Sequence, residues 1–491
     1  MKYFPRIAVF MTLLTILAVS FTVELWSTEN PMEAAERAYR FGEYEKAVTE
    51  FTRVIRSEQP DANLFLRRGL AYEGLQKYTE ATSDYSRAIK LNPSLTSAYN
   101  NRGSVYYKQR LFDKAVNDFN RAIELNPTYS LAYYNRGNAY YGKGELDLAI
   151  EDFTQAIKLN PKDADAYNNR GWALLDKGET KRSIKDFERA LRINPEYTLA
   201  YYNRGDARLK IGETERSIQD FSKAIELNPR YALAYFKRGN AQAQIEKLDE
   251  ALQDYNQAVR LRPGQANIYN NRGWVFFRKG SYQRALQDIN QALSINPKLA
   301  QAYLNRGWIY KDLRKWKAAI QDFSKAIDLE KNQPHVYMFR GECYLKLGDI
   351  DKAMKDLEQA KTLGSEDPFI YVLLGNIKER VGDYPASINL FRKYVEAKPD
   401  DANSHFNLGI SLGKAGNYDE AIEQFTRAIE IEPKNKEAYL KRAIAYEFVG
   451  DSEKAHVDFQ KALSLPEEQQ QQKSLREPVS ITHVKELLSA R

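Results

Sequence analysis

Along most of this chain, apolar residues recur with the spacing of amphipathic helices, in segments of about a dozen residues. One pair of such segments is "SAYNNRGSVYYKQ" at 97–109 followed by "FDKAVNDFNRAIEL" at 112–125. Glycine or another turn residue often separates the two segments, and Asn-Pro often ends the second, because proline disfavours a helical conformation in the residue before it. The pattern predicts an all-α chain built from helix–turn–helix units.

The units return with a fixed period. Gly69 and Gly103 are 34 residues apart, and glycines continue at that spacing as far as Gly409. We number each unit so that this glycine is position 8. Position 4 is then usually tyrosine, positions 20 and 27 are usually small residues, and position 24 is usually aromatic. Because a lone helical pair buries little surface, we expect the units to stack into a solenoid with a continuous core.

This pattern resembles the tetratricopeptide repeat family, whose Leu-Gly, Tyr, Ala, Phe, Ala and Pro recur within 34 residues. The resemblance covers residues 28–469, or about thirteen tandem repeats. It implies a right-handed superhelical solenoid that presents an extended wall to other proteins. A row of asparagines at position 6 is also similar to the asparagine ladder in the repeats of the O-linked N-acetylglucosamine transferase, although no transferase domain follows here.

Position 7 is leucine in the family pattern, but arginine in ten repeats of this chain. The same ten repeats have aspartate at position 23, and repeats 11 and 12 lose both residues together. A cation at the rim of the packed side needs a counter-charge. We therefore predict an ion pair within each repeat, giving a structural role to pairs such as Arg102 with Asp118, Arg136 with Asp152 and Arg170 with Asp186. An anion-binding strip of arginines is the functional alternative.

Position 6 falls on the open side of the first helix when that helix is unrolled at about 100° per residue. An amide offers a donor and an acceptor, which suits it to the backbone of an extended peptide. We predict a peptide-binding row, in which a lysine interrupts the asparagines: Asn101, Asn135, Asn169, Asn203, Lys237, Asn271, Asn305 and Asn407. The alternative is that each amide bridges to the helix of the neighbouring repeat.

Aromatic residues flank this row on the same predicted side. Position 9 holds Trp172, Trp274 and Trp308, position 5 holds Tyr134, Tyr202 and Phe236, and position 12 includes Phe277. The core stripe is already assigned to the other side, so these side chains are predicted to contact a ligand. The alternative is that they pack against the adjacent helix.

The two ends of the chain differ from the repeats. Residues 1–23 combine a basic start with the uncharged run 7–23, which predicts a signal peptide or an N-terminal membrane anchor. Either would place the bulk of the chain outside the cytoplasm, in the periplasm, in a lumen or outside the cell. Residues 470–491 read as a polar linker and an amphipathic helix that caps the last repeat.

Composition narrows the function further. The chain has 73 Lys and Arg against 66 Asp and Glu, one cysteine and four scattered histidines, which favours neither nucleic acid nor a multi-cysteine zinc site. We recognise no nucleophile–base arrangement, phosphate loop or metal-ligand spacing, so we expect no enzyme and no cofactor. The sequence predicts a scaffold for extended segments of other proteins. Binding of a glycan or cell-wall polymer, or of single-stranded nucleic acid, is the alternative.

Overall fold

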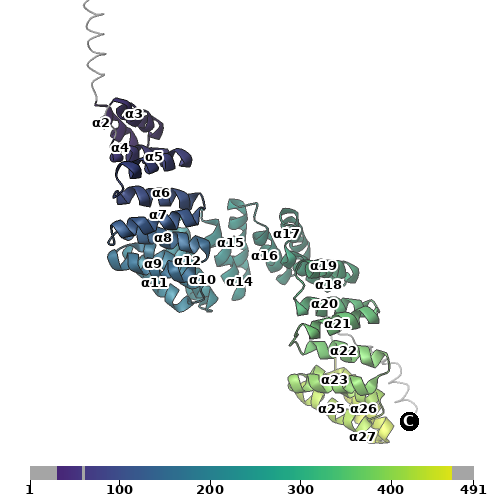
Figure 1. The fold of residues 1–491 in the computed structure, drawn as a ribbon. Helices are drawn as coiled ribbons and strands as arrows, with labels where there is room; N and C mark the ends of the chain where they lie inside the picture. The colour runs from purple at the N-terminus through teal and green to yellow at the C-terminus, as the bar shows by residue number, and fades with distance from the viewer. Residues whose placement is uncertain (1–29, 58–60, 467–491) are drawn as a thin grey trace, which may run out of the picture. The chain divides into compact units, whose positions relative to one another are not determined.

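The computed structural model describes residues 30–57 and 61–466, all of them in helices or short connections (Figure 1). The predicted signal or anchor segment 1–23 and the predicted capping helix within 470–491 lie outside the described residues. Within the described ranges no helix is long and apolar enough to cross a membrane. The chain divides into two compact units, unit 1 up to Leu261 and unit 2 from Arg262.

Each repeat contributes a first helix and a second helix, and the two pack against each other. The first helices of unit 1 are α2 (Pro31–Arg40), α4 (Ala62–Gly74), α6 (Thr96–Lys108), α8 (Ser130–Lys143), α10 (Ala164–Asp176), α12 (Thr198–Lys210) and α14 (Ala232–Gln244). Those of unit 2 are α16 (Ala266–Arg278), α18 (Ala300–Asp312), α20 (Pro334–Lys346), α22 (Phe369–Arg380), α24 (Ala402–Lys414) and α26 (Lys436–Val449).

The second helices follow after short turns. In unit 1 they are α3 (Tyr44–Ser57), α5 (Tyr78–Leu91), α7 (Phe112–Leu125), α9 (Leu146–Leu159), α11 (Thr180–Ile193), α13 (Thr214–Leu227) and α15 (Leu248–Leu261). In unit 2 they are α17 (Tyr282–Ile295), α19 (Trp316–Leu329), α21 (Ile350–Thr362), α23 (Tyr384–Ala397), α25 (Tyr418–Ile431) and α27 (Ser452–Ser464). The all-α solenoid of helix pairs predicted from the period is confirmed.

The glycine at position 8 lets the two helices of a repeat approach closely. A Cβ atom added to Gly103 would lie 2.8 Å from the ring of Phe119, the buried position-24 residue of the same repeat. The alanines Ala115 and Ala122 on either side of that ring are fully buried. The core of each repeat is therefore one large side chain against a glycine, framed by alanines, which explains the recurrent residues of the period.

Successive first helices lie close together within each unit. In unit 1, α4 contacts α6, α6 contacts α8, and the series continues to α14, whereas consecutive second helices approach each other less. In unit 2, α16 contacts α18, α20 contacts α22 and α24 contacts α26. Besides the packing of each second helix on the next first helix, neighbouring repeats thus also meet along their first helices, and we call the exposed side of these helices the inner face.

Candidate functional site

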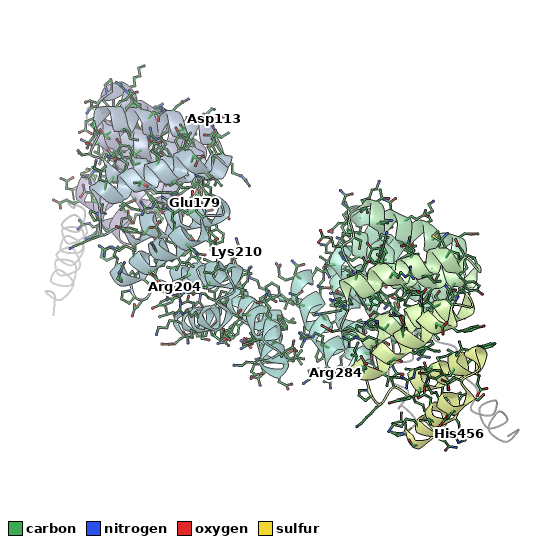
Figure 2. All side chains as sticks on the ribbon, turned by 90° about the horizontal axis from the view of Figure 1, so that it is seen from below. Asp113, Glu179, Arg204, Lys210, Arg284 and His456 are labelled. Atoms are coloured by element: carbon green, nitrogen blue, oxygen red, sulfur yellow. The ribbon has the colours of Figure 1, made fainter. Side chains whose placement is uncertain are left out.

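All ten predicted Arg–Asp pairs are present, each joining the first and second helix of one repeat. In nine of them the Nε and Nη2 atoms of the arginine lie 2.7 to 2.8 Å from the two carboxylate oxygens. In the tenth, Arg204 (labelled in Figure 2) donates to Asp220 and shares that carboxylate with Arg208. The prediction of a within-repeat ion pair is confirmed.

The third guanidinium nitrogen reaches the preceding repeat. Nη1 of Arg102 donates to Ser86 Oγ at 2.9 Å, and Nη1 of Arg136 donates to Asn120 Oδ1 at 2.6 Å. Both acceptors are at position 25 of the preceding repeat, in its second helix. The guanidinium carbon also lies over the position-4 ring of its own helix, as for Arg102 over Tyr99 at 5.8 Å. One arginine side chain therefore connects three helices.

These pairs are partly buried, and burial acts against them. Asp152 is 4% exposed, and burial raises the pKa of its carboxyl by more than the hydrogen bond from Arg136 lowers it. Burial also disfavours the charged form of Arg136 and so lowers its pKa. The hydrogen bond to Asp152 and the charge of that carboxylate raise the pKa of Arg136 by more than burial lowers it. The desolvation of both charges offsets much of their attraction, so we assign the pairs to fixing the helix register rather than to adding stability.

Repeats 11 and 12 replace the pair in two different ways. In repeat 11, Leu374 is buried and packs in one apolar cluster with Leu390. In repeat 12, the buried His405 at position 4 joins the helices instead: its Nδ1 lies 2.8 Å from Gln424 Oε1, and its Nε2 lies 2.9 Å from the carbonyl oxygen of Pro399. Losing arginine and aspartate together thus leaves no unpaired charge.

The position-6 side chains form hydrogen bonds between repeats. Asn135 Nδ2 donates to Asn100 Oδ1 at 3.0 Å, and Asn169 Nδ2 donates to Tyr134 Oη and Asn138 Oδ1. The lysine that interrupts the row follows the same rule, because Lys237 Nζ pairs with Asp206 of the preceding first helix. At these positions the structure supports the bridging alternative to the peptide-binding row.

The sequence reasoning missed the second half of this network, the asparagines at position 5. Asn100, Asn168 and Asn270 are each at most 4% exposed, and each donates to the next residue along the chain, Asn101, Asn169 or Asn271. Asn203 and Asn305 in turn donate to Asn168 and Asn270. The sequence Asn-Asn-Arg-Gly could have predicted this network, because it marks the repeats in which position 5 is an amide as well as position 6.

Three residues of the predicted site do not lie on an open surface. Asn203 is 3% exposed, Asn305 is 5% exposed, and Tyr202 is 9% exposed between Phe221 and Tyr231. At position 6, Asn203 and Asn305 face the preceding first helix, and at position 5 Tyr202 faces the core ring of its own repeat. A wheel drawn for one isolated helix shows neither contact. For these three residues the predicted exposure is wrong. Asn101, Asn135, Asn169, Asn271 and Asn407 are half-buried.

The remaining predicted aromatics are half-buried along the same helices. Tyr134 and Phe236 tilt against the core rings of their own repeats, with centroid distances of 5.9 and 6.1 Å. Trp172 Nε1 donates to Tyr141 Oη, whose hydroxyl donates to Asp176. These side chains contact the adjacent first helix and keep part of their surface open.

Unit 2 has the denser group of inner-face aromatics. The rings of Trp274 and Phe277 are 5.1 Å apart on α16. Trp308 of α18 meets Phe339 of α20 edge-on at 4.3 Å, and Lys311 Nζ lies 4.5 Å from the Trp308 ring centroid. The structure brings these rings together in pairs, and all four remain half-buried rather than sealed.

Family comparisons agree with this architecture. Models described as tetratricopeptide repeat match residues 96–129, 134–198, 202–266, 266–299, 300–333, 334–363, 370–401, 402–435 and 425–457, and one described as TPR repeat matches 74–109. This chain belongs to the tetratricopeptide repeat family. Repeats of this family form scaffolds for protein–protein interaction, and the solenoid of this chain is such a scaffold. The curated proteins include no match to this chain.

Several solved structures are similar to parts of this repeat protein. The crystal structure of YrrB, described as a TPR protein with an unusual peptide-binding site, is 29% identical and has a TM-score of 0.34 over 38% of this chain and 95% of its own. MamA is 27% identical, with a TM-score of 0.32 over 34% of this chain and 96% of its own. The APC/C hetero-tetramer Cut9–Hcn1 is 16% identical, with a TM-score of 0.46 over 95% of this chain and 97% of the matched chain.

Proposed function

We propose that this repeat protein is a non-enzymatic scaffold that binds extended segments of partner proteins on its inner face. The observation that carries the proposal is the half-buried tryptophan at position 9 in both units, Trp172 in unit 1 and Trp274 and Trp308 in unit 2. The core of each repeat is already filled by the position-24 residue and its alanines. Large aromatic side chains that keep open surface beside polar groups are typical of protein-binding sites.

The asparagines have a narrower role in this proposal. Asn135 and Asn203 each donate one hydrogen bond from Nδ2 to the preceding repeat, and Asn169 donates two. In this proposal the aromatic side chains at positions 9 and 12 make the main contacts with the peptide. The half-buried amides accept additional hydrogen bonds from the peptide. Within each unit, an amide network of this kind holds the first helices in a fixed spacing, which keeps the aromatic side chains of that unit in register for an extended ligand.

The binding proposal is tested with a library of unstructured peptides panned against the purified full chain. We expect the selected peptides to bind Trp274→Ala/Trp308→Ala at least about tenfold more weakly, because aromatic anchors carry most of the energy of such contacts. Leu148→Ala and Val457→Ala serve as controls, since both side chains are exposed, 42% and 62%, on second helices. Peptides that bind both groups of variants equally would contradict the proposal.

The same variants separate the alternative ligands. The aromatics would be assigned to a soluble glycan or a single-stranded oligonucleotide under three conditions. The wild type retains that ligand, Trp274→Ala/Trp308→Ala does not, and no peptide binds. For the amides, Asn135→Ala/Asn169→Ala is expected to lower the melting temperature and to leave peptide affinity nearly unchanged. A selective loss of peptide affinity would restore the ladder as a peptide-binding row.

We also propose that this scaffold acts outside the cytoplasm, exported or tethered through residues 7–23. Support comes from Lys2 and Arg6, which precede an uncharged run that acidic residues follow. The test is cell fractionation of the full chain beside a variant that lacks residues 1–23. We expect the full chain in the membrane or exported fraction and the variant in the cytosol, and a full chain found only in the cytosol would refute the proposal.

A further inference from the structure

Basic residues stand at the C-terminal ends of three successive first helices of unit 2, α18, α20 and α22. Lys311, Lys346 and Arg380 lie in the last turns of these helices. Arg314 follows α18 and takes the left-handed conformation, with φ of 56°. The four residues come from repeats 9, 10 and 11.

Two contacts place Lys311 and Arg380 against the last turns of α20, which carry Lys346. Arg380 Nη1 donates to the carbonyl oxygen of Leu345, the residue before Lys346, at 3.4 Å. Lys311 Nζ pairs with Glu342 Oε2 at 2.9 Å, about one turn before Lys346 on the same helix. Lys346 is therefore approached from the preceding repeat and from the following one.

Lys346 itself is half-buried, and within the described residues its ammonium makes no hydrogen bond or ion pair. Burial lowers its pKa, and the charges of Lys311, Arg314 and Arg380 lower it further, while Glu342 acts in the opposite direction. Other nearby acids are engaged: Asp312 accepts the hydroxyl of Tyr282, and Glu379 pairs with Lys414. The cluster thus has an excess of positive charge that the fold does not neutralise.

The dipoles of the helices do not account for this cluster. A cation in the last turn is favourable at the C-terminus of any helix, which explains one basic residue for each of the three. It does not explain an unpaired, half-buried ammonium placed beside three other cations, because that arrangement is unfavourable in the free protein. Such a cost is recovered when an anion binds.

We propose that Lys346, Arg314 and Arg380 bind the carboxylates of an acidic segment in a partner protein. The inference rests on the proposed function and names the chemistry of the segment that repeats 9 to 11 accept. Charge complementarity selects the acidic residues. The corner of Trp308 and Phe339 adjoins the cluster through Lys311, whose ammonium lies 4.5 Å from the Trp308 centroid and 6.0 Å from that of Phe339, and it takes an apolar side chain of the same segment.

The test uses the purified full chain and two synthetic probes, a short glutamate-rich peptide with one leucine and its counterpart with glutamine at every glutamate. By fluorescence anisotropy we expect only the acidic peptide to bind, with an affinity that falls as salt rises. Lys346→Gln and Arg314→Gln/Arg380→Gln should each weaken binding about tenfold or more, as expected when charge-assisted hydrogen bonds are lost. Lys210→Gln is the matched control, because Lys210 is an exposed lysine at the same repeat position in unit 1.

A second readout needs no variant. Acetylation of lysine amines in the wild-type chain, followed by mass spectrometry, should show Lys346 protected by the acidic peptide and not by its glutamine counterpart. Equal binding to all variants, or protection of Lys346 by a single-stranded oligonucleotide but not by the acidic peptide, would overturn the inference. If the inference fails while library peptides still depend on Trp274 and Trp308, the proposed function stands; if no peptide binds at all, both fail.

Discussion

At the residue scale, the arginine at position 7 shows how one charged side chain replaces a leucine without leaving a buried charge alone. Arg136 gives two donors to Asp152 on its own second helix and a third to Asn120 on the preceding one. Its guanidinium also lies 5.6 Å from the centroid of Tyr133. Apolar contacts of a leucine at this position would have no preferred direction. The N–H donors of the planar guanidinium have fixed directions, so the hydrogen bonds form only when the three helices are placed correctly.

We predict that Arg136→Leu destabilises the region of α8 and α9 by roughly 3–5 kcal/mol, because it leaves the buried Asp152 carboxylate without a counter-charge. The double variant Arg136→Leu/Asp152→Leu should recover most of that loss, since repeat 11 already has this composition with Leu374 and Leu390. Thermal unfolding and hydrogen exchange of the α8–α9 amides measure both effects.

Exposed ion pairs supply the control for this experiment. Lys223 and Glu226 pair on the surface of α13 at 2.6 Å, with side chains 40% and 66% exposed. Lys223→Leu should change the melting temperature far less than Arg136→Leu, because exposed ion pairs contribute little to stability. A loss after Arg136→Leu as small as that after Lys223→Leu, or a double variant less stable than the single one, would contradict a register-fixing role for the buried pair.

At the element scale, the separation of the two helices in a repeat is set by position 8. For Gly273 of α16, an added Cβ would lie 2.8 Å from Ile289 Cγ1 and 3.1 Å from the carbonyl oxygen of Ala285. A backbone carbonyl inside a helix cannot rotate away, so the whole helix has to move. Ala443 stands at position 8 of the last described repeat, where it is fully buried in one apolar cluster with Phe459.

We predict that Gly273→Ala destabilises the protein by about 1–3 kcal/mol through overpacking, even though alanine is the better helix former. Gly413 in the last turn of α24 is the matched control, because an added Cβ there meets nothing within 4 Å. Gly413→Ala should raise stability by about 0.5–1 kcal/mol. Melting temperatures of the two variants test the pair, and a Gly273→Ala protein as stable as the wild type would show that the helices separate at little cost.

The elements also show where prediction from the sequence succeeds. The period, the helix pairs and the Arg–Asp partners follow from residues that recur in register, because each repeat solves the same packing problem. Position 5 was misassigned, because Asn168 accepts from Asn203 of the next first helix and Tyr202 packs on Phe221 in the second helix of its own repeat. The Asn–Asn network needs coordinates because several of its bonds join residues of neighbouring repeats.

At the scale of the whole molecule, contacts between equivalent positions make the chain nearly one-dimensional. In unit 1, a first helix contacts its own second helix, the preceding second helix and the neighbouring first helices. Stability in such an array is approximately a sum of repeat and nearest-neighbour contributions. A whole repeat should therefore be removable when the new neighbours have matching side chains.

Residues 164–197, the fifth repeat, provide that test, because their deletion joins Asp163 directly to Thr198 at the same point of the period. Asp163 now accepts from Ala166 N at the start of α10, and after deletion Ala200 takes that place. Asn203 would face Tyr134 and Asn138, which now bind Asn169, and Arg204 would face Thr154, which now binds Arg170. These groups at the new interface would thus find partners of the kind they have now, whereas Arg208 would lose Glu188 and Asp147 would lose Lys177.

We expect the in-period deletion to keep the helical circular dichroism per residue and a melting temperature within a few degrees of the wild type. Deleting only residues 164–193 is the control, since it leaves Asn194 to Tyr197 in place and shifts every following residue out of register. That variant should aggregate or lose the α8–α12 packing, because buried amides such as Asn203 would no longer match partners on α8, although Arg204 keeps Asp220 in its own repeat. Equal behaviour of the two deletions would mean that apolar packing alone, without the Arg–Asp and Asn–Asn bonds, sets how the repeats stack.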